Sequence, residues 1–129
     1  MLNIDRIYLD IDGVFLDENY KQMPHLKKFL KAVFDVAAEE VYWLSVHSKH
    51  GDNDIVLEHL GDTLDRDIFE MIKPIKNTKW ENLKTEGIDL DSNFIWFDDN
   101  VFDREYTVLE DIGKEHCLIK VKSNLDEMV

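Results

Sequence analysis

Short apolar runs alternate along this chain with segments of helical periodicity, and the alternation limits the possible folds more than any other feature. Apolar runs bounded by polar or acidic residues predict buried strands, and amphipathic stretches predict helices. We expect strands at 6–12, 41–45, 93–100 and 116–122, and helices at 25–40, 53–60 and 102–112. Strands separated by helices predict an α/β fold in which a central parallel sheet carries helices on both faces, as a three-layer sandwich.

The connection between the second and third expected strands is less regular. Residues 62–75 fit a helix or, around IFEMI, a short strand, and Pro74 ends either element. Thr78 then precedes KWENLKTEG at 79–87, which predicts an N-capped helix closed by Gly87.

Size and composition indicate one folded unit. A chain of 129 residues with 44% hydrophobic residues can bury a single core. Two prolines and five glycines, none gathered into a linker, offer no domain boundary, so we expect a single domain over residues 1–129. The lone Cys117, and an N-terminus without the basic start and long apolar run of a signal peptide, favour a cytoplasmic location.

The formal charge of −13, from 28 acidic and 15 basic residues, narrows the range of partners. Such a field repels polyanions and anionic membrane surfaces. No apolar stretch approaches the roughly 20 residues that span a bilayer. We therefore expect neither long nucleic acids nor a membrane as partner. Phosphate chemistry remains compatible with this charge, because a bound divalent cation reverses the local field of a carboxylate-lined site.

Polar residues directly follow three of the expected strands. Asp10 and Asp12 close the first strand, Ser45 the second, and Asp98 and Asp99 the third. Ligands of parallel α/β sheets bind at the carboxyl ends of the strands, so these side chains should converge. Several carboxylates in one place need a cation, and an oxygen-rich site with open positions suits Mg²⁺. Mg²⁺ is therefore the expected cofactor.

The same residues carry a resemblance to a known family. IYLDIDGV at 7–14 resembles the first motif of the haloacid dehalogenase-like (HAD) superfamily, an apolar strand followed by Asp-x-Asp-Gly-Thr/Val. Ser45 after VYWL is similar to the second motif, and FIWFDD at 94–99 is similar to the fourth. The motifs occur in the order typical of the family.

The third motif of the family is a lysine upstream of the fourth. We prefer Lys79, because it opens the helix expected before the strand that carries the acidic pair. Lys76 is the alternate, and Lys73 is the weakest candidate. The resemblance implies that this lysine neutralises charge on the nucleophile and on the transferring group, while Ser45 donates a hydrogen bond to the phosphoryl oxygens.

The resemblance also implies a phosphatase chemistry on a Rossmann-like fold. Asp10 would be the nucleophile that forms an aspartyl-phosphate, and Asp12 would be general acid and then general base. Asp10, the backbone carbonyl of Asp12 and Asp98 would bind Mg²⁺. Asp99 would either share the metal or hold a metal-bound water. The expected activity is Mg²⁺-dependent hydrolysis of phosphomonoesters.

Substrate selection in this superfamily commonly resides in cap domains inserted after the first motif or between the second and third. The gaps from Asp12 to Ser45 and from Ser45 to Lys79 are filled by the elements expected there. The resemblance therefore implies a capless member with at most a small flap near residues 14–22. Such an open site admits a phosphorylated small metabolite, a nucleotide or a phosphoprotein, or is completed by a homo-oligomer or another partner.

Two other functions are compatible with parts of the pattern. A HAD-like binding or regulatory module without chemistry, acting through a partner, is the main alternative, although every expected side-chain type is present. A phosphoacceptor receiver uses similar groups, but its acidic pair comes first, whereas here Asp-x-Asp-Gly-Val comes first and the pair late.

His47 and His50 follow Ser45 closely and stand near the expected site mouth. No cysteine or third histidine occurs at a recognisable ligand spacing, so we do not expect them to bind zinc. A substrate contact or a solvated loop suits them better. Trp80, unlike the tryptophans in the expected strands, is a candidate for the pocket lining.

Overall fold

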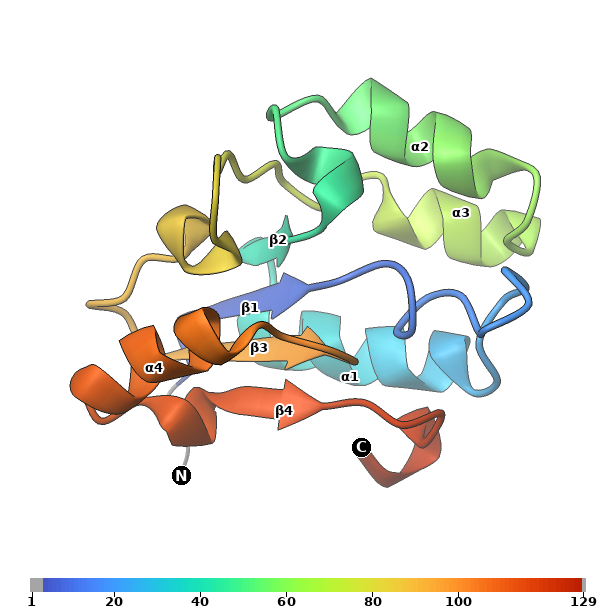
Figure 1. The fold of residues 1–129 in the computed structure, drawn as a ribbon. Coiled ribbons are helices and arrows are strands. Elements are labelled where there is room, and N and C mark those ends of the chain that lie inside the picture. The colour runs from blue at the N-terminus through green and yellow to red at the C-terminus, as the bar shows by residue number, and fades with distance from the viewer. Residues whose placement is uncertain (1–3, 129) are drawn as a thin grey trace.

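The computed structural model describes residues 4–128, which include a four-stranded sheet (Figure 1). The strands are β1 (Arg6–Leu9), β2 (Val41–Trp43), β3 (Phe94–Asp98) and β4 (Leu118–Lys120). All neighbours pair in parallel, in the order β2-β1-β3-β4. The predicted α/β class with a parallel sheet is confirmed, and each strand is shorter than the run that predicted it.

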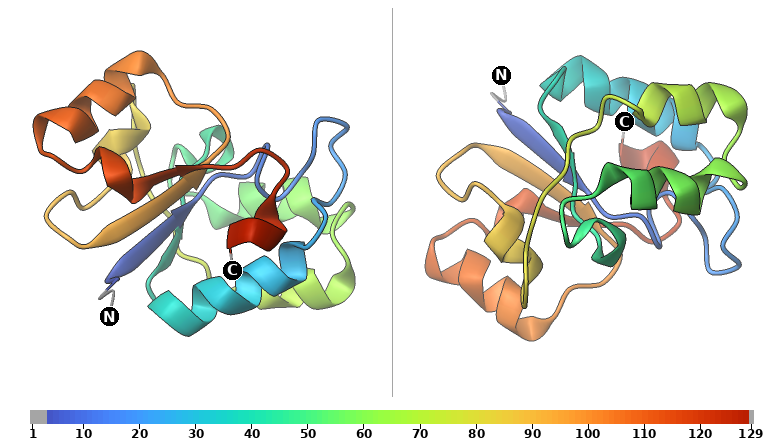
Figure 2. Two further views of the ribbon diagram at one scale, coloured as in Figure 1. Left: turned by 90° about the horizontal axis from the view of Figure 1, so that it is seen from below. Right: turned by 90° about the horizontal axis from the view of Figure 1, so that it is seen from above.

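Helices flank this sheet on opposite sides. Helix α1 (Leu26–Ala37) lies against one face and α4 (Asp103–Asp111) lies over the other (Figure 2). Helices α2 (Asn53–Gly61) and α3 (Arg66–Ile72) lie beyond the β2 edge, and α3 resolves the ambiguous segment 62–75 as a helix (Figure 1). Short 3₁₀ helices occur at η1 (Val46–Ser48), η2 (Lys84–Gly87), η3 (Glu115–Cys117) and η4 (Leu125–Met128).

Alternating side chains of β1 contribute to two separate parts of the core. Ile7 and Leu9 pack in the cluster that includes the buried side of α1. Tyr8 packs in the other cluster, with Trp96 of β3 and Leu109 of α4. Successive strand residues face opposite sides of a sheet, so one central strand anchors helices on both faces. Full burial of each large apolar side chain contributes about 1.5–3 kcal/mol, which keeps the strand ends in fixed positions.

The prediction of a helix over 79–87 is wrong, because only the single turn η2 forms there. Before η2 the chain pairs first with β2, where Lys76 N donates to Val41 O and Trp43 N to Lys76 O, both at 2.9 Å, and then with the loop after β2, where Lys79 pairs with His50. Thr78, expected as an N-cap, donates its hydroxyl to Trp43 O instead. Backbone pairing with the edge of the sheet outweighs the weak local helix preference of this segment.

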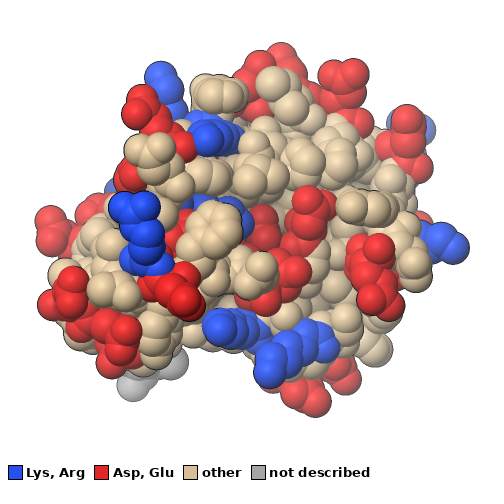
Figure 3. Space-filling model, viewed as in Figure 1, with Lys and Arg blue, Asp and Glu red and all other residues tan. Residues whose placement is uncertain are grey.

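The surface carries many acidic side chains. On the face seen in Figure 3, Asp and Glu side chains are widely spread, with Lys and Arg interspersed among them. No helix within residues 4–128 combines the length and apolar character needed to cross a bilayer.

Candidate active site

The carboxyl ends of β1 and β3 meet where the strand order of the sheet reverses. The chain passes from β1 to β2 on one side, whereas β3 lies on the other side of β1. Parallel α/β proteins bind ligands in the crevice beyond such a switch point. The register pairs Leu9 with Phe97, so Asp10 and Asp98 come next on adjacent strands, and Asp10 N donates to Phe97 O at 3.0 Å. The structure thus brings together the two acidic strand ends.

Asp10, Asp98 and Asp99 form a group of carboxylates, which we call the acidic cluster. Their candidate ligand atoms all lie within 4.8 Å of one another. Asp98 is 0% and Asp10 is 5% exposed, whereas Asp99 is exposed. Buried carboxylates this close repel each other and lose their hydration, so a cation or a bound proton must compensate their charge.

Lys84 supplies a compensating charge within the protein. Its Nζ lies 2.8 Å from Asp98 Oδ2 and 3.3 Å from Asp10 Oδ1, and its side chain is 11% exposed. One ammonium group therefore serves two buried carboxylates, and the three side chains carry a net negative charge only when Asp10 and Asp98 are both ionised. The predicted site residues did not include Lys84.

None of the three lysines considered for this position reaches the acidic cluster. Lys79 is exposed on the extended segment before η2. Lys76 Nζ pairs with Glu40 at 3.5 Å, and Lys73 Nζ pairs with Glu70 at 3.0 Å. The preference for Lys79 depended on a helix beginning there. The helical turn that does form begins at Lys84 instead.

Glu105, a residue of the site that was not predicted from the sequence, links the Lys84 segment to α4. Its side chain is buried, with Oε2 accepting a hydrogen bond from Lys84 N at 2.6 Å and Oε1 accepting one from Phe102 N at 2.9 Å. An acid three residues into a helix commonly accepts from the backbone at the N-cap. Its position in the first turn of the predicted helix 102–112 could have indicated the hydrogen bond from Phe102 N, but not the one from Lys84 N.

The buried charges shift each other's pKa values. Burial and then the negative charge of Asp98 raise the pKa of Asp10 well above its usual range, although Lys84 opposes the shift. Burial and Asp98 also raise the pKa of Asp99. Burial acts to lower the pKa of Lys84, but the attraction of Asp10 and Asp98 outweighs burial and raises it. Binding of a divalent cation would therefore compete with a proton on Asp10.

Gly13 allows the loop after β1 to pass directly against the acidic cluster. Its φ is +84°, and a Cβ at this position would lie 2.1 Å from Asp99 Cγ. Glycine accepts both the left-handed conformation and the close approach. The glycine of the Asp-x-Asp-Gly motif is thus required by the path of the loop.

Asp12 lies beside two histidines rather than within the acidic cluster. Asp12 Oδ2 is 3.0 Å from His47 Nε2, and Asp12 Oδ1 is 3.8 Å from His59 Nε2. The two imidazole rings stack with their centroids 3.9 Å apart. His47 belongs to η1 and His59 to α2, so the tertiary structure supplies the second histidine that sequence spacing did not reveal. His50 is exposed.

Ser45 follows β2 and caps η1. Its side chain is completely buried, and its Oγ accepts a hydrogen bond from His47 N at 3.1 Å. Its backbone carbonyl accepts a hydrogen bond from Trp80 Nε1 at 3.2 Å. A phosphate-binding role for the Ser45 hydroxyl stays a prediction.

A cavity of about 240 Å³ opens above the nucleophile candidate Asp10. Lys84 and Trp80 line it, and Trp80 was a candidate for the pocket lining from the sequence. Val46 and Phe102 also line it and are 60% and 66% exposed, so two apolar side chains stand at its mouth.

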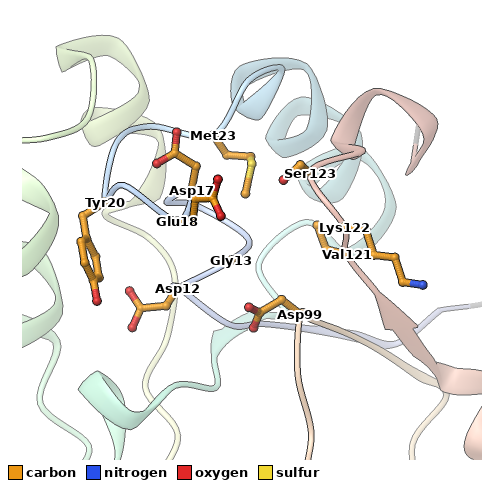
Figure 4. Close-up of a pocket in the computed structure, with 10 residues that line it drawn as sticks. All are labelled: Asp12, Gly13, Asp17, Glu18, Tyr20, Met23, Asp99, Val121, Lys122 and Ser123. Carbon is orange, nitrogen blue, oxygen red and sulfur yellow. The ribbon is translucent and has the colours of Figure 1, made fainter.

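A second cavity, of about 340 Å³, lies on the other side of Asp12 and Asp99. Figure 4 shows these two carboxylates along one edge of it, with Tyr20 on one side and Lys122 on the other. Both cavities therefore share the Asp12 and Asp99 side chains.

Comparison with family models, curated proteins and solved structures finds no match for this chain.

Proposed function

We propose that this chain is a Mg²⁺-dependent phosphomonoester hydrolase of the HAD-like type, built on a Rossmann-like three-layer fold. The main supporting observation is that Asp10 and Asp98 lie buried side by side at the strand ends with Lys84 between them. An ion pair that served stability alone would need neither the third carboxylate, Asp99, nor a cavity over Asp10. A buried carboxyl with a strongly raised pKa beside a cavity is typical of a functional site.

The side chains of the acidic cluster fit a magnesium ion. Carboxylate oxygens are the ligands that Mg²⁺ prefers, and candidate atoms from three residues lie within 4.8 Å of one another. Asp10 and Asp98 would hold the ion together with the backbone carbonyl of Asp12, while Asp99 would share it or hold a bound water. When bound, Mg²⁺ neutralises negative charge on the transferring phosphoryl group.

Asp10 is the proposed nucleophile. One of its carboxylate oxygens attacks phosphorus, the bond from phosphorus to the leaving oxygen breaks, and an aspartyl-phosphate forms. Asp12 donates a proton to the leaving oxygen. Lys84, beside Asp10, attracts the phosphoryl oxygens and takes the role that the resemblance implied for Lys79.

Asp12 then acts as general base in the second step. Its carboxylate takes a proton from a water molecule, the water oxygen attacks phosphorus, and the bond from phosphorus to Asp10 breaks. Inorganic phosphate leaves, and Asp10 and Asp12 return to their starting states. The His47 ring at 3.0 Å contacts the Asp12 carboxylate and limits its orientations.

The cavity over Asp10 suits a phosphoryl group whose leaving group extends into solvent. Its volume of about 240 Å³ is below the range of about 300–1,000 Å³ typical of pockets that enclose a whole ligand. Val46 and Phe102 offer apolar contact at the mouth. The proposed substrate is a phosphomonoester with an apolar or aromatic part next to the phosphate, whether in a small metabolite, a nucleotide or a phosphoprotein.

Hydrolysis of p-nitrophenyl phosphate with and without Mg²⁺ tests this function. The comparison includes Asp10→Asn and, as a matched control, Asp91→Asn, an exposed carboxylate before the opposite end of β3. All proteins are used at equal concentrations of folded chain. We expect Mg²⁺-dependent turnover that Asp10→Asn abolishes and Asp91→Asn leaves intact. Absence of turnover with Mg²⁺ or other divalent ions would overturn the proposal and favour a HAD-like module without chemistry.

A further inference from the structure

Two buried atoms beside the acidic cluster lack hydrogen-bond partners within the described part of the chain. Asp12 Oδ1 and His59 Nε2 are both sealed from solvent, and they lie 3.8 Å apart. That distance is too long for a hydrogen bond. Buried polar atoms are normally satisfied, and an unpaired carboxylate oxygen near an unpaired imidazole nitrogen is an arrangement that a bound ion explains.

We propose that Asp12, His47 and His59 bind a divalent transition-metal ion, with Zn²⁺ as the best fit. One candidate ligand atom from each residue lies within 4.8 Å of the other two. In a tetrahedral zinc site, bonds of about 2.0–2.2 Å separate the ligand atoms by about 3.3–3.6 Å. His47 Nε2 lies 3.0 Å from Asp12 Oδ2, and His59 Nε2 lies 3.8 Å from Asp12 Oδ1, so each imidazole nitrogen is near this spacing from one oxygen of the carboxylate.

The two imidazole rings must open before both nitrogens coordinate one ion. The rings stack with 21° between their planes, so the lone pairs of their nitrogens lie in nearly parallel planes and do not converge on one point. The His47 and His59 side chains are 26% and 31% exposed, so this opening is a rotation of partly exposed rings rather than of core side chains. Two imidazoles and one carboxylate leave a fourth tetrahedral position for water.

Ligand chemistry separates this site from the acidic cluster. Imidazole nitrogens suit Zn²⁺, whereas a group made only of carboxylates suits Mg²⁺. The three residues of the acidic cluster and the three residues Asp12, His47 and His59 have no member in common. The two ions would therefore bind side by side without competing for a side chain.

Zn²⁺ at the histidine site would occupy the carboxylate of Asp12. A carboxylate bound to zinc neither donates nor accepts the proton that hydrolysis requires, so turnover would stop on Zn²⁺ binding and resume on chelation. This consequence rests on the proposed hydrolysis, whereas Zn²⁺ binding itself does not.

Calorimetric titration of the full chain with Zn²⁺, in excess Mg²⁺, tests the binding. The variants are His47→Ala, His59→Ala and, as matched control, His50→Ala, which removes an exposed histidine near the same loop. Loss of even an outer partner of a metal ligand costs about 10- to 100-fold in affinity, so loss of a ligand should cost at least roughly 10-fold. We expect that loss for His47→Ala and His59→Ala, with no change for His50→Ala. Absence of binding, or equal affinity in all variants, would overturn the proposal.

Imidazole ¹⁵N spectra of the unmodified chain provide a readout that needs neither a variant nor turnover. Zn²⁺ should shift the ring nitrogens of His47 and His59 and leave those of His25, His50 and His116 in place. Shifts confined to the latter three would rule out the site.

The outcomes for the two proposals can be told apart. A chain that binds Zn²⁺ at His47 and His59 but hydrolyses no phosphoester would reject only the proposed function. An active chain without Zn²⁺ binding would reject only this inference.

Discussion

Replacing Lys84 with methionine removes the one ammonium group shared by Asp10 and Asp98. Methionine keeps most of the apolar stem, so the change is chiefly one of charge. Lys79→Met is the matched control, because Lys79 is exposed and was the lysine expected at the site. We predict a large loss of stability for Lys84→Met in the metal-free chain and almost none for Lys79→Met.

The magnitude follows from the two distances to the Lys84 ammonium. At 2.8 and 3.3 Å, with an effective dielectric constant of about 20, the attractions are about 6 and about 5 kcal/mol before the cost of burial is subtracted. Removing one member of a buried pair typically costs about 3–5 kcal/mol. The Lys84 side chain keeps 11% exposure, so we expect the lower end, about 3 kcal/mol. An exposed lysine such as Lys79 should change stability by less than about 0.5 kcal/mol.

Urea unfolding at neutral pH without divalent ions measures this difference. With a slope of about 1.5 kcal/mol per molar urea, a loss of about 3 kcal/mol lowers the midpoint by about 2 M. Without Lys84 the pKa of Asp10 rises further, so lowering the pH should protonate Asp10 and reduce the loss. Equal midpoints for Lys84→Met and Lys79→Met would refute the assignment of Lys84 to the buried charge cluster.

Three further substitutions test other parts of the site. Asp10→Asn should stabilise the metal-free chain at neutral pH by about 1 kcal/mol. Because the folded pKa of Asp10 is raised, the stability of the unmodified chain should fall as the pH rises from the unfolded pKa of about 4 through the folded pKa. A flat pH profile of that stability, measured by urea unfolding, would contradict this. Glu105→Gln should lower the free energy of unfolding by about 1–3 kcal/mol, because an amide NH₂ would face the backbone N–H of Lys84 or Phe102. An unchanged urea midpoint would argue against these two hydrogen bonds. Phe102→Ala should raise KM for an aryl phosphate about fivefold through loss of about 1 kcal/mol of apolar contact, and a loss confined to kcat would be inconsistent with that role.

The meeting of Asp10 with Asp98 was predictable because it depends on two local signals. Each aspartate directly follows an apolar run, and parallel strands place their carboxyl ends at one edge of a sheet. Neither signal requires knowledge of the path that the chain takes between the strands.

The positions of Lys84 and His59 depend on that path and were not predictable. Thr78 resembles a helix cap in sequence, yet its hydroxyl bonds to β2, so the segment continues extended and the lysine that reaches the site comes later. His59 lies on the predicted helix 53–60, where nothing local distinguishes it from a surface histidine. Only the packing of α2 over η1 brings its ring against His47.

Identification of the residue that carries the phosphoryl group tests the central claim most directly. The chain is quenched with acid during turnover of a phosphomonoester, and its peptides are analysed by mass spectrometry. We predict one phosphoryl group on the peptide that contains Asp10 and none in Asp10→Asn. Turnover during which this peptide never carries a phosphoryl group, or during which another residue carries it, would contradict the role of Asp10 as nucleophile.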